Sequence, residues 1–191
     1  MSGIKNIKIN KDWLYHAVNS KVIDKIVLSG GIKSKKKIKE YGGKVRKGNN
    51  LCNGNHYISL SKKSDDKGTS YKTYSEGSFA LIVDDVDAVK AEQKEFDILW
   101  EKISKLPLKK RYSFWNDEYQ VKDEIPLDKV VGIKIPSKDY SFWPKTEEEK
   151  KQEIERFIKK VEALDVDIPY IDVDEEKQID QDSIRDYMSK R

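Results

Sequence analysis

An acidic cluster begins one of the most apolar segments of the chain. In FWNDEYQVKDEIPLDKVVGIKI (residues 114–135), Glu118 and two polar neighbours lie between Trp115 and Tyr119, just before a run of core-forming residues. Acidic side chains are seldom fully buried unless they are paired or functional. A surface turn that leads into a strand is the simplest interpretation of Glu118 taken alone. A carboxylate held there could also stabilise positive charge that develops during a reaction.

Two other strand-like segments carry side chains with possible chemical roles. WLYHAV (residues 13–18) contains His16, and HYISLS (residues 56–61) contains Tyr57. Taken alone, His16 is more often a hydrogen-bonded structural histidine, and Tyr57 is more often a packing residue on a sheet. His56 is expected on the strand face opposite Tyr57, because side chains alternate along a strand. Two histidines and one cysteine form no persuasive metal site.

The hydrophobic pattern predicts an α+β protein with strands dominating its first two-thirds. Strands are predicted at residues 13–18, 56–61 and 79–83, and twice within 114–135 with a turn at about 125–128. Helices are predicted at residues 20–29 and 86–105, and from Thr146 onward, where Thr146 and Glu149 form a capping box. The buried stripe of the first helix is predicted to be Val22, Ile23, Ile26 and Val27. Residues 33–47 and 62–77 are predicted loops, and beyond Asp165 the chain is acidic, with a weak helix at 182–188 or disorder.

Taken in order, these motifs resemble those of the ADP-ribosyltransferase superfamily, specifically its His-Tyr-Glu branch. That branch contains the poly(ADP-ribose) polymerase catalytic domains and the diphtheria-like toxins. WLYHAVNSKVIDKIVLSGGI matches a strand with a Leu-hydrophobic-His-Gly type motif and a following helix that ends at glycine. Tyr57 opens the second motif, YISLS, and NDEYQV matches the third, an Asn-Glu-Tyr-hydrophobic-Val strand, apart from one extra acid, Asp117. The resemblance covers roughly residues 13–136 and implies a split β-sheet core with peripheral helices.

The resemblance implies NAD as co-substrate and a role for each motif residue. Glu118 is implied to be the catalytic carboxylate, which stabilises the cation-like sugar formed when the bond between nicotinamide and ribose breaks. Tyr57 is implied to stack on the nicotinamide ring. His16 is implied to hydrogen-bond the adenosine-side ribose.

The resemblance also implies two further contacts with NAD. The backbone of Ala17 is implied to hold the nicotinamide amide. Alanine keeps the amide and carbonyl that the family's glycine supplies there and adds a methyl group. A second stacking aromatic is expected after the first, at Tyr71 or, alternatively, at Tyr74.

A rival branch of the superfamily uses Arg, Ser and Glu. Ser59 and Ser61 share the strand face of Tyr57 by period two and could supply its serine. His16 where that branch needs arginine argues against it. Asn116, two residues before Glu118, does not support the arginine specificity found in some members of that branch.

Charge is strongly separated along the chain. The net charge is +4, yet Lys33–Lys47 is basic with the single acid Glu40, while Glu162–Asp182 is acidic with only Lys177 opposing. The basic run could bind phosphate of a nucleic acid or of a nucleotide. On charge alone, a solvated lysine-rich loop is favoured. Two alternatives to an enzyme therefore stay open: a nucleic-acid-binding module that uses this run, or a non-catalytic transferase-like scaffold.

The resemblance implies a transferase, and the length of the chain suits one of modest size. Its 191 residues suit a catalytic domain at 1–140 followed by a C-terminal helix and acidic tail at 141–191. No apolar run is long enough to span a bilayer, no cleaved signal peptide is expected, and the lone Cys52 suits a reducing compartment. The resemblance implies a mono-ADP-ribosyltransferase or an NAD hydrolase, and these features lead us to expect it in the cytoplasm or delivered into a host cytoplasm. A protein or nucleic-acid acceptor, and a bacterial effector, toxin or phage-related origin, are expected.

Overall fold

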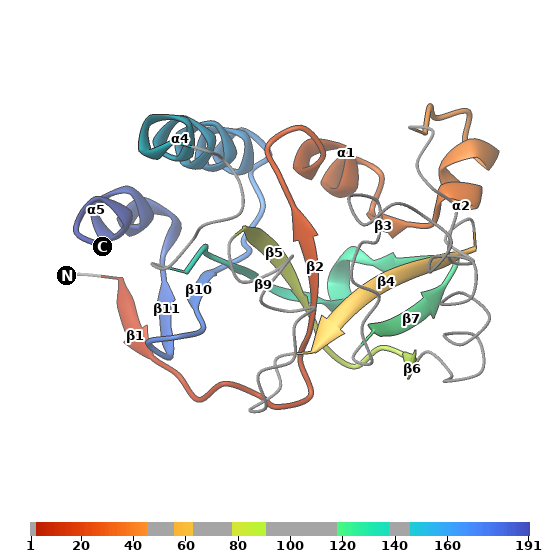
Figure 1. Ribbon diagram of the computed structural model, residues 1–191, viewed down its shortest axis with the longest axis horizontal. Helices are drawn as coiled ribbons and strands as arrows, with labels where there is room; N and C mark the ends of the chain where they lie inside the picture. The colour runs from red at the N-terminus through yellow and green to blue at the C-terminus, as the bar shows by residue number, and fades with distance from the viewer. Residues whose placement is uncertain (1–2, 46–55, 63–77, 91–117, 138–145) are drawn as a thin grey trace, which may run out of the picture.

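The computed structural model describes residues 3–45, 56–62, 78–90, 118–137 and 146–191. Within these residues the chain forms a mixed α+β structure around a nine-stranded, mostly antiparallel sheet (Figure 1). The strands of the sheet, in spatial order, are β1 (Ile4–Asn6), β11 (Lys177–Ile179), β10 (Tyr170–Asp172), β9 (Val130–Lys134), β5 (Phe79–Val83), β2 (Leu14–Val18), β4 (Tyr57–Lys62), β7 (Glu118–Lys122) and β6 (Val89–Lys90). A second, two-stranded sheet pairs β3 (Gly31–Lys33) with β8 (Glu124–Pro126). The predicted α+β class is confirmed at this level.

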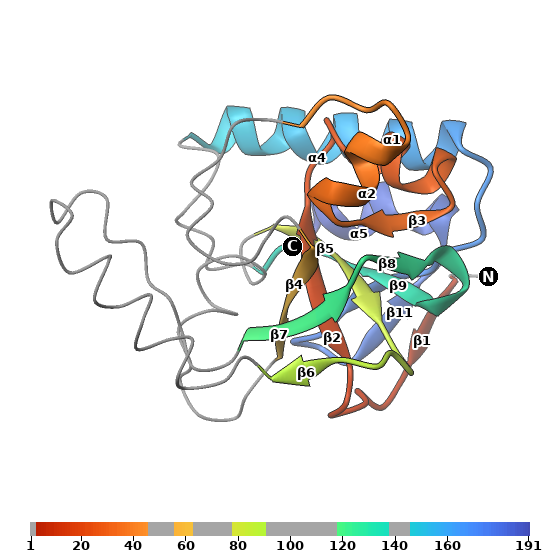
Figure 2. The ribbon, with the colours of Figure 1, turned by 90° about the vertical axis from the view of Figure 1, so that its right-hand side faces the viewer.

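Helices cover one face of the large sheet. They are α1 (Ile23–Leu28), α2 (Lys35–Glu40), α4 (Glu147–Ala163) and α5 (Ile184–Ser189), with 3₁₀ turns at Leu127–Lys129 and Gln181–Ser183. Figure 2 shows α1, α2 and α4 on the same side of the strands. The larger apolar core lies between α1, α4, α5 and this face, and a smaller cluster that includes Tyr15 and Ile82 lies on the other face.

Strand β5 illustrates why the central strands form. Its sequence FALIV is apolar throughout, and all five residues are buried. Because alternate residues of a strand face opposite sides, Phe79, Leu81 and Val83 enter the larger core. Ala80 and Ile82 enter the smaller one. The strand predicted at residues 79–83 is confirmed with the same bounds.

Helix α4 begins where the sequence predicted. The Thr146 hydroxyl accepts from the Glu149 amide at 3.1 Å, and the Glu149 carboxylate accepts from the Thr146 amide at 3.1 Å, which completes the capping box. The buried face of the helix is made by Phe157, Ile158 and Val161. The Phe157 ring stacks on Phe79, with ring centroids 3.9 Å apart, and so anchors the helix on the sheet.

The first helix and the basic run differ from the prediction. Helix α1 is shorter than predicted, because Asn19 caps a turn by accepting from the Lys21 amide at 2.9 Å before the helix begins. Val22 does not belong to the buried stripe, since it is 37% exposed. The loop predicted at 33–47 is wrong for residues 35–40, which form α2 after the N-cap residue Ser34. Lysine is a good helix former, so a lysine-rich segment with a serine cap can form a helix.

Two other local predictions need correction. The helix predicted at 86–105 is wrong at its start, because Val89–Lys90 form β6, which pairs with β7; residues 91–105 lie outside the described residues. The two strands predicted within 114–135 are present but do not pair with each other. Between them Asp123 adopts a positive φ of 65°, and β8 leaves the large sheet to pair with β3. The predicted turn at 125–128 is thus replaced by β8 and a 3₁₀ turn.

The acidic C-terminal segment is not a frayed end. Strand β10 pairs in parallel with β9, and β11 pairs with both β10 and β1. Tyr170 and Ile179 are fully buried in the same core as the central strands. The predicted weak helix is present as α5, at residues 184–189. Residues 141–191, predicted as an extension of a domain at 1–140, therefore share the sheet and core with it wherever the structure describes them.

Candidate functional site

The strands that carry the three motif residues are immediate neighbours in the sheet. Their order is β2, β4, β7, and in this register Tyr15 lies opposite Ser61, which lies opposite Glu118. Neighbouring strands are about 4.8 Å apart, so the backbones of Tyr15 and Glu118 lie about 10 Å from each other. The backbone of His16, the residue after Tyr15, is therefore near that of Glu118, but because side chains alternate along a strand, His16 belongs to the opposite face of β2 from Tyr15.

The sheet parts beside His16. In the described residues β2 pairs with β5 along its whole length, from Leu14 to Val18, but with β4 at only two positions, Leu14 and Tyr15. After Tyr15, the backbones of β2 and β4 no longer form ladder pairs in the described residues. The His16 imidazole bridges the two strands there, with its Nδ1 atom 3.1 Å from the carbonyl oxygen of Ser59. A side-chain hydrogen bond from His16 therefore joins β2 to β4 where their backbone pairing has ended.

This hydrogen bond sets the chemical state of His16. A carbonyl only accepts, so Nδ1 must carry the proton, and in the neutral ring Nε2 is then an acceptor. Burial lowers the pKa of His16 below its ordinary value, and the bond to the Ser59 carbonyl opposes that change. We therefore describe His16 as neutral near pH 7, with Nε2 able to accept a hydrogen bond from a hydroxyl group.

Tyr57 lies at the other end of the β4–β7 ladder from Glu118. It is half-buried and pairs with Lys122, whereas Glu118 pairs with Ser61, four residues further along β4. Four strand residues span about 13 Å. Tyr57 and Glu118 therefore lie at opposite ends of the β4–β7 ladder and do not meet at one point.

The remaining predicted residues have mixed outcomes. Ala17 is exposed and pairs with Ala80 of β5, beyond the last β2–β4 pair. Tyr71 and Tyr74, like Asn116 and Asp117, lie outside the described residues, so their roles stay predictions. His56, treated as structural, is exposed, and its carbonyl accepts from the Asp123 amide at 2.8 Å.

Sequence reasoning missed two contributions from β4. The backbone carbonyl of Ser59 orients His16, and no sequence signal identifies a backbone acceptor on a distant strand. Ser61 was considered only for a rival branch, yet it is buried, and its hydroxyl lies 3.4 Å from the carbonyl oxygen of Tyr15. Its position opposite Glu118 could be found only from the register.

Comparisons with known proteins leave this geometry as the main evidence. No protein-family model, curated protein or solved structure matches the chain. Among the described residues, no group of three or more His, Cys, Asp and Glu side chains is arranged to bind a metal ion. The described helices also include none that is both long and apolar enough to cross a bilayer.

Proposed function

We propose that this protein is an NAD-dependent mono-ADP-ribosyltransferase with the split-sheet fold of the His-Tyr-Glu branch. The observation that carries the proposal is the adjacency of β2, β4 and β7, the three strands that bear His16, Tyr57 and Glu118. It is supported by the early end of the β2–β4 ladder at Tyr15, the residue before His16.

The reaction breaks the bond between the ribose C1′ atom and the nicotinamide nitrogen. The bonding electrons leave with neutral nicotinamide, and C1′ becomes electron-deficient as in glycoside hydrolysis. The carboxylate of Glu118 stabilises this positive charge and holds the ribose hydroxyls. An acceptor then forms the new bond to C1′ with its own electron pair and gives up a proton to solvent.

The other residues bind and orient NAD. Tyr57 offers the flat face of its ring to nicotinamide, at the half-buried end of β4. His16 accepts a hydrogen bond from a ribose hydroxyl through Nε2, since its Nδ1 donates to the Ser59 carbonyl. The backbone of Ala17, past the end of the β2–β4 ladder, holds the nicotinamide amide.

The setting of the reaction is part of the proposal. The acceptor is a protein or a nucleic acid, and water is the competing acceptor, which makes NAD hydrolysis the side reaction. The lone Cys52 supports a reducing compartment, either the cytoplasm in which the protein is made or that of a host. An effector, toxin or phage-related role is part of the proposal, and it is supported by the small size and the lysine- and isoleucine-rich composition of the chain.

The test is removal of one charge. Glu118→Gln keeps the size of the side chain and removes the carboxylate, so nicotinamide release should fall by about two to three orders of magnitude. Glu124→Gln is the matched control, since Glu124 is exposed on the neighbouring β8. It should retain wild-type activity. Release of nicotinamide and transfer of labelled ADP-ribose in cell lysate are both measured, with circular dichroism to show that each variant is folded.

Two results would refute the proposal. One is wild-type protein that releases no nicotinamide above the buffer blank. The other is a folded Glu118→Gln variant that is as active as the Glu124→Gln control.

A further inference from the structure

One end of the molecule carries a concentrated positive charge. Residues 21–45 contain eight lysines and only two acidic residues, a net charge of +6, whereas the whole chain carries +4. We call these lysines the basic surface: Lys21, Lys25, Lys33, Lys35, Lys36, Lys37, Lys39 and Lys44. They lie on α1, β3 and α2 and just outside them, where Lys21 precedes α1 and Lys44 follows α2. Five of them, including Lys25, Lys39 and Lys44, are exposed.

The acidic residues nearby leave most of this charge unneutralised. Asp24 pairs with Lys160 of α4 at 3.0 Å, not with a lysine of the basic surface. Glu40 is shared by Lys36 at 3.7 Å and Lys37 at 3.4 Å. No carboxylate in the described parts of the chain pairs with the other lysines of the basic surface.

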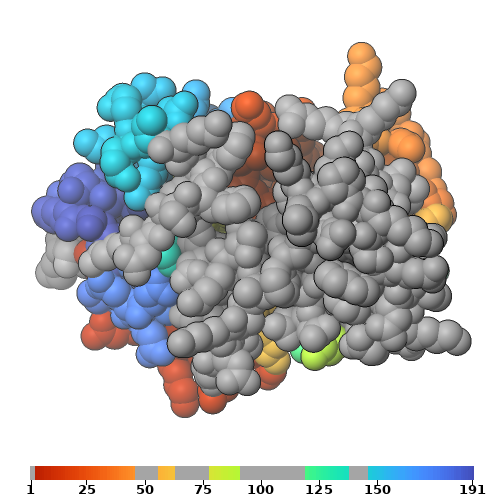
Figure 3. All heavy atoms as spheres, viewed as in Figure 1, coloured from red at the N-terminus to blue at the C-terminus, as the bar shows by residue number. Residues whose placement is uncertain are grey.

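The acidic C-terminal segment does not cover the basic surface. Its strands, β10 and β11, pair with β9 and β1, and they lie at the other end of the molecule from α2 in Figure 1. Figure 3 shows α2 in orange at one end of the molecule and α4 and α5 in cyan and dark blue at the other. In the part of the chain that the structure describes, the acidic strands therefore lie away from α2 and do not cover it.

An exposed aromatic ring stands on the basic surface. Tyr41, which ends α2, is 69% exposed, and the Lys33 ammonium lies 5.4 Å from its ring centroid. The chain turns directly after it, at Gly42 with φ of 76°. An exposed ring among cations is the arrangement on which single-stranded nucleic acids stack a base while lysines hold the phosphates. We therefore favour a single-stranded nucleic acid as the occupant over a bilayer surface or an acidic peptide.

The basic surface is tied to the candidate site. The Ser34 amide, at the start of α2, donates to the Asp123 carbonyl at 2.7 Å, and the Asp123 amide donates to the His56 carbonyl at 2.8 Å. His56 precedes Tyr57. Two backbone hydrogen bonds therefore hold the beginning of α2 next to the Tyr57 end of the β4–β7 ladder.

We propose that the basic surface binds single-stranded nucleic acid. Resting on the proposed function, nucleic acid is then the acceptor class for ADP-ribose. If about five lysines contact phosphates, log affinity falls with log salt with a slope of about −3.5. Affinity should then drop about a hundredfold between about 50 mM and about 200 mM salt.

The experiment measures binding without NAD. Fluorescence anisotropy follows a labelled oligonucleotide of roughly 20 nucleotides, as DNA and as RNA, with the full chain at both salt concentrations. The triple variant Lys25→Gln, Lys39→Gln, Lys44→Gln removes three exposed cations and should lower the salt slope by about 2. Tyr41→Ala should weaken binding roughly tenfold, by loss of base stacking.

The matched control removes the same charge elsewhere. The variant Lys5→Gln, Lys8→Gln, Lys151→Gln changes three exposed lysines outside the basic surface. Its affinity and salt slope should stay close to wild type. Equal losses in both triple variants would overturn the proposal, because the binding would then depend on net charge alone. Preference for phosphatidylserine vesicles or polyglutamate over the oligonucleotide would overturn it as well.

The outcome is separable from that of the proposed function. Wild-type protein that releases nicotinamide but binds neither oligonucleotide overturns the nucleic-acid surface and leaves the transferase intact. Protein that binds oligonucleotides through the basic surface but releases no nicotinamide supports the surface and refutes the transferase.

Discussion

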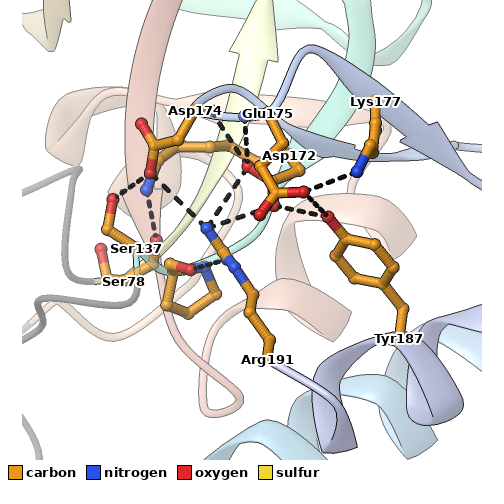
Figure 4. A network of polar contacts seen from close by, with 10 residues as sticks. Ser78, Ser137, Asp172, Asp174, Glu175, Lys177, Tyr187 and Arg191 are labelled. Carbon is orange, nitrogen blue, oxygen red and sulfur yellow. Dashed lines mark hydrogen bonds and ion pairs between the residues drawn. The ribbon is translucent and has the colours of Figure 1, made fainter. Parts of the chain in front are cut away.

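Asp172 offers a sharp test of how the C-terminal segment is held in the fold. This carboxylate on β10 is fully buried, and Figure 4 shows it at the centre of a polar network. Its Oδ2 atom lies 3.2 Å from the Arg191 guanidinium and accepts from the Tyr187 hydroxyl at 2.8 Å. Its Oδ1 atom accepts from the backbone amides of Asp174 and Glu175, each at 3.0 Å. One carboxylate thus joins β10, the turn after it, α5 and Arg191, two residues beyond the end of α5.

Asp172→Asn removes the charge and nearly preserves the shape. Loss of one partner from a buried ion pair costs about 3–5 kcal/mol, because the other charge stays buried. Here the Arg191 side chain is 6% exposed but keeps Asp174 at 3.5 Å and the Pro136 carbonyl. We therefore expect the lower end, a loss of about 3 kcal/mol in the free energy of unfolding. Such a loss is a large share of the roughly 5–15 kcal/mol that stabilises a typical domain.

Tyr187→Phe tests the same network from α5. The hydroxyl donates to a charged acceptor, and its removal should cost about 1.5 kcal/mol. The double variant Asp172→Asn, Tyr187→Phe should cost less than the sum of the two losses, by about 1 kcal/mol, because each change removes part of the same bond.

Urea unfolding, followed by tryptophan fluorescence, measures these losses. The control is Asp167→Asn, which changes an exposed acid in the same segment and should stay within about 0.5 kcal/mol of wild type. An Asp172→Asn variant as stable as that control would refute the reasoning. Strict additivity in the double variant would show that Asp172 and Tyr187 act independently.

Two further predictions concern α1, β3 and His16. Gly31→Ala should destabilise the protein by more than about 3 kcal/mol in urea unfolding, since φ is 149° and an added methyl would overlap the Ile125 backbone oxygen. Gly30→Ala, where φ is 79° and the space is open, should cost only about 1 kcal/mol, and equal losses would contradict this. Burial lowers the pKa of His16 in the folded protein, so the unfolded chain binds a proton on His16 more readily. The free energy of unfolding is therefore unaffected by His16 well above its ordinary pKa of 6.5 and decreases as pH falls through that value. His16→Gln should therefore reduce the loss of stability between about pH 7.5 and about pH 5.5, whereas an unchanged loss would contradict the depressed pKa.

Local structure was largely predictable from local sequence. Strand β5 has five consecutive apolar residues, and α4 has a capping box before its apolar stripe, so each is specified by neighbours along the chain. Gly30 ends the first helical segment because it adopts a positive φ that costs glycine little. Motif reasoning also selected His16, Tyr57 and Glu118, which lie on strands that prove to be adjacent.

What the sequence alone determined is therefore the type and approximate position of the main strands and helices, together with a set of candidate residues. Only the tertiary structure decided which strands pair. It placed Ser61 opposite both Tyr15 and Glu118, set the Ser59 carbonyl against His16, and drew β10 into the core despite its acidic surroundings. Strand pairing joins segments that are distant along the chain. The free energy that stabilises each pair comes from burial and from hydrogen bonds with partners that no local sequence pattern identifies. The charges of the basic surface were visible in the sequence, but their distance from the acidic segment was set by the fold.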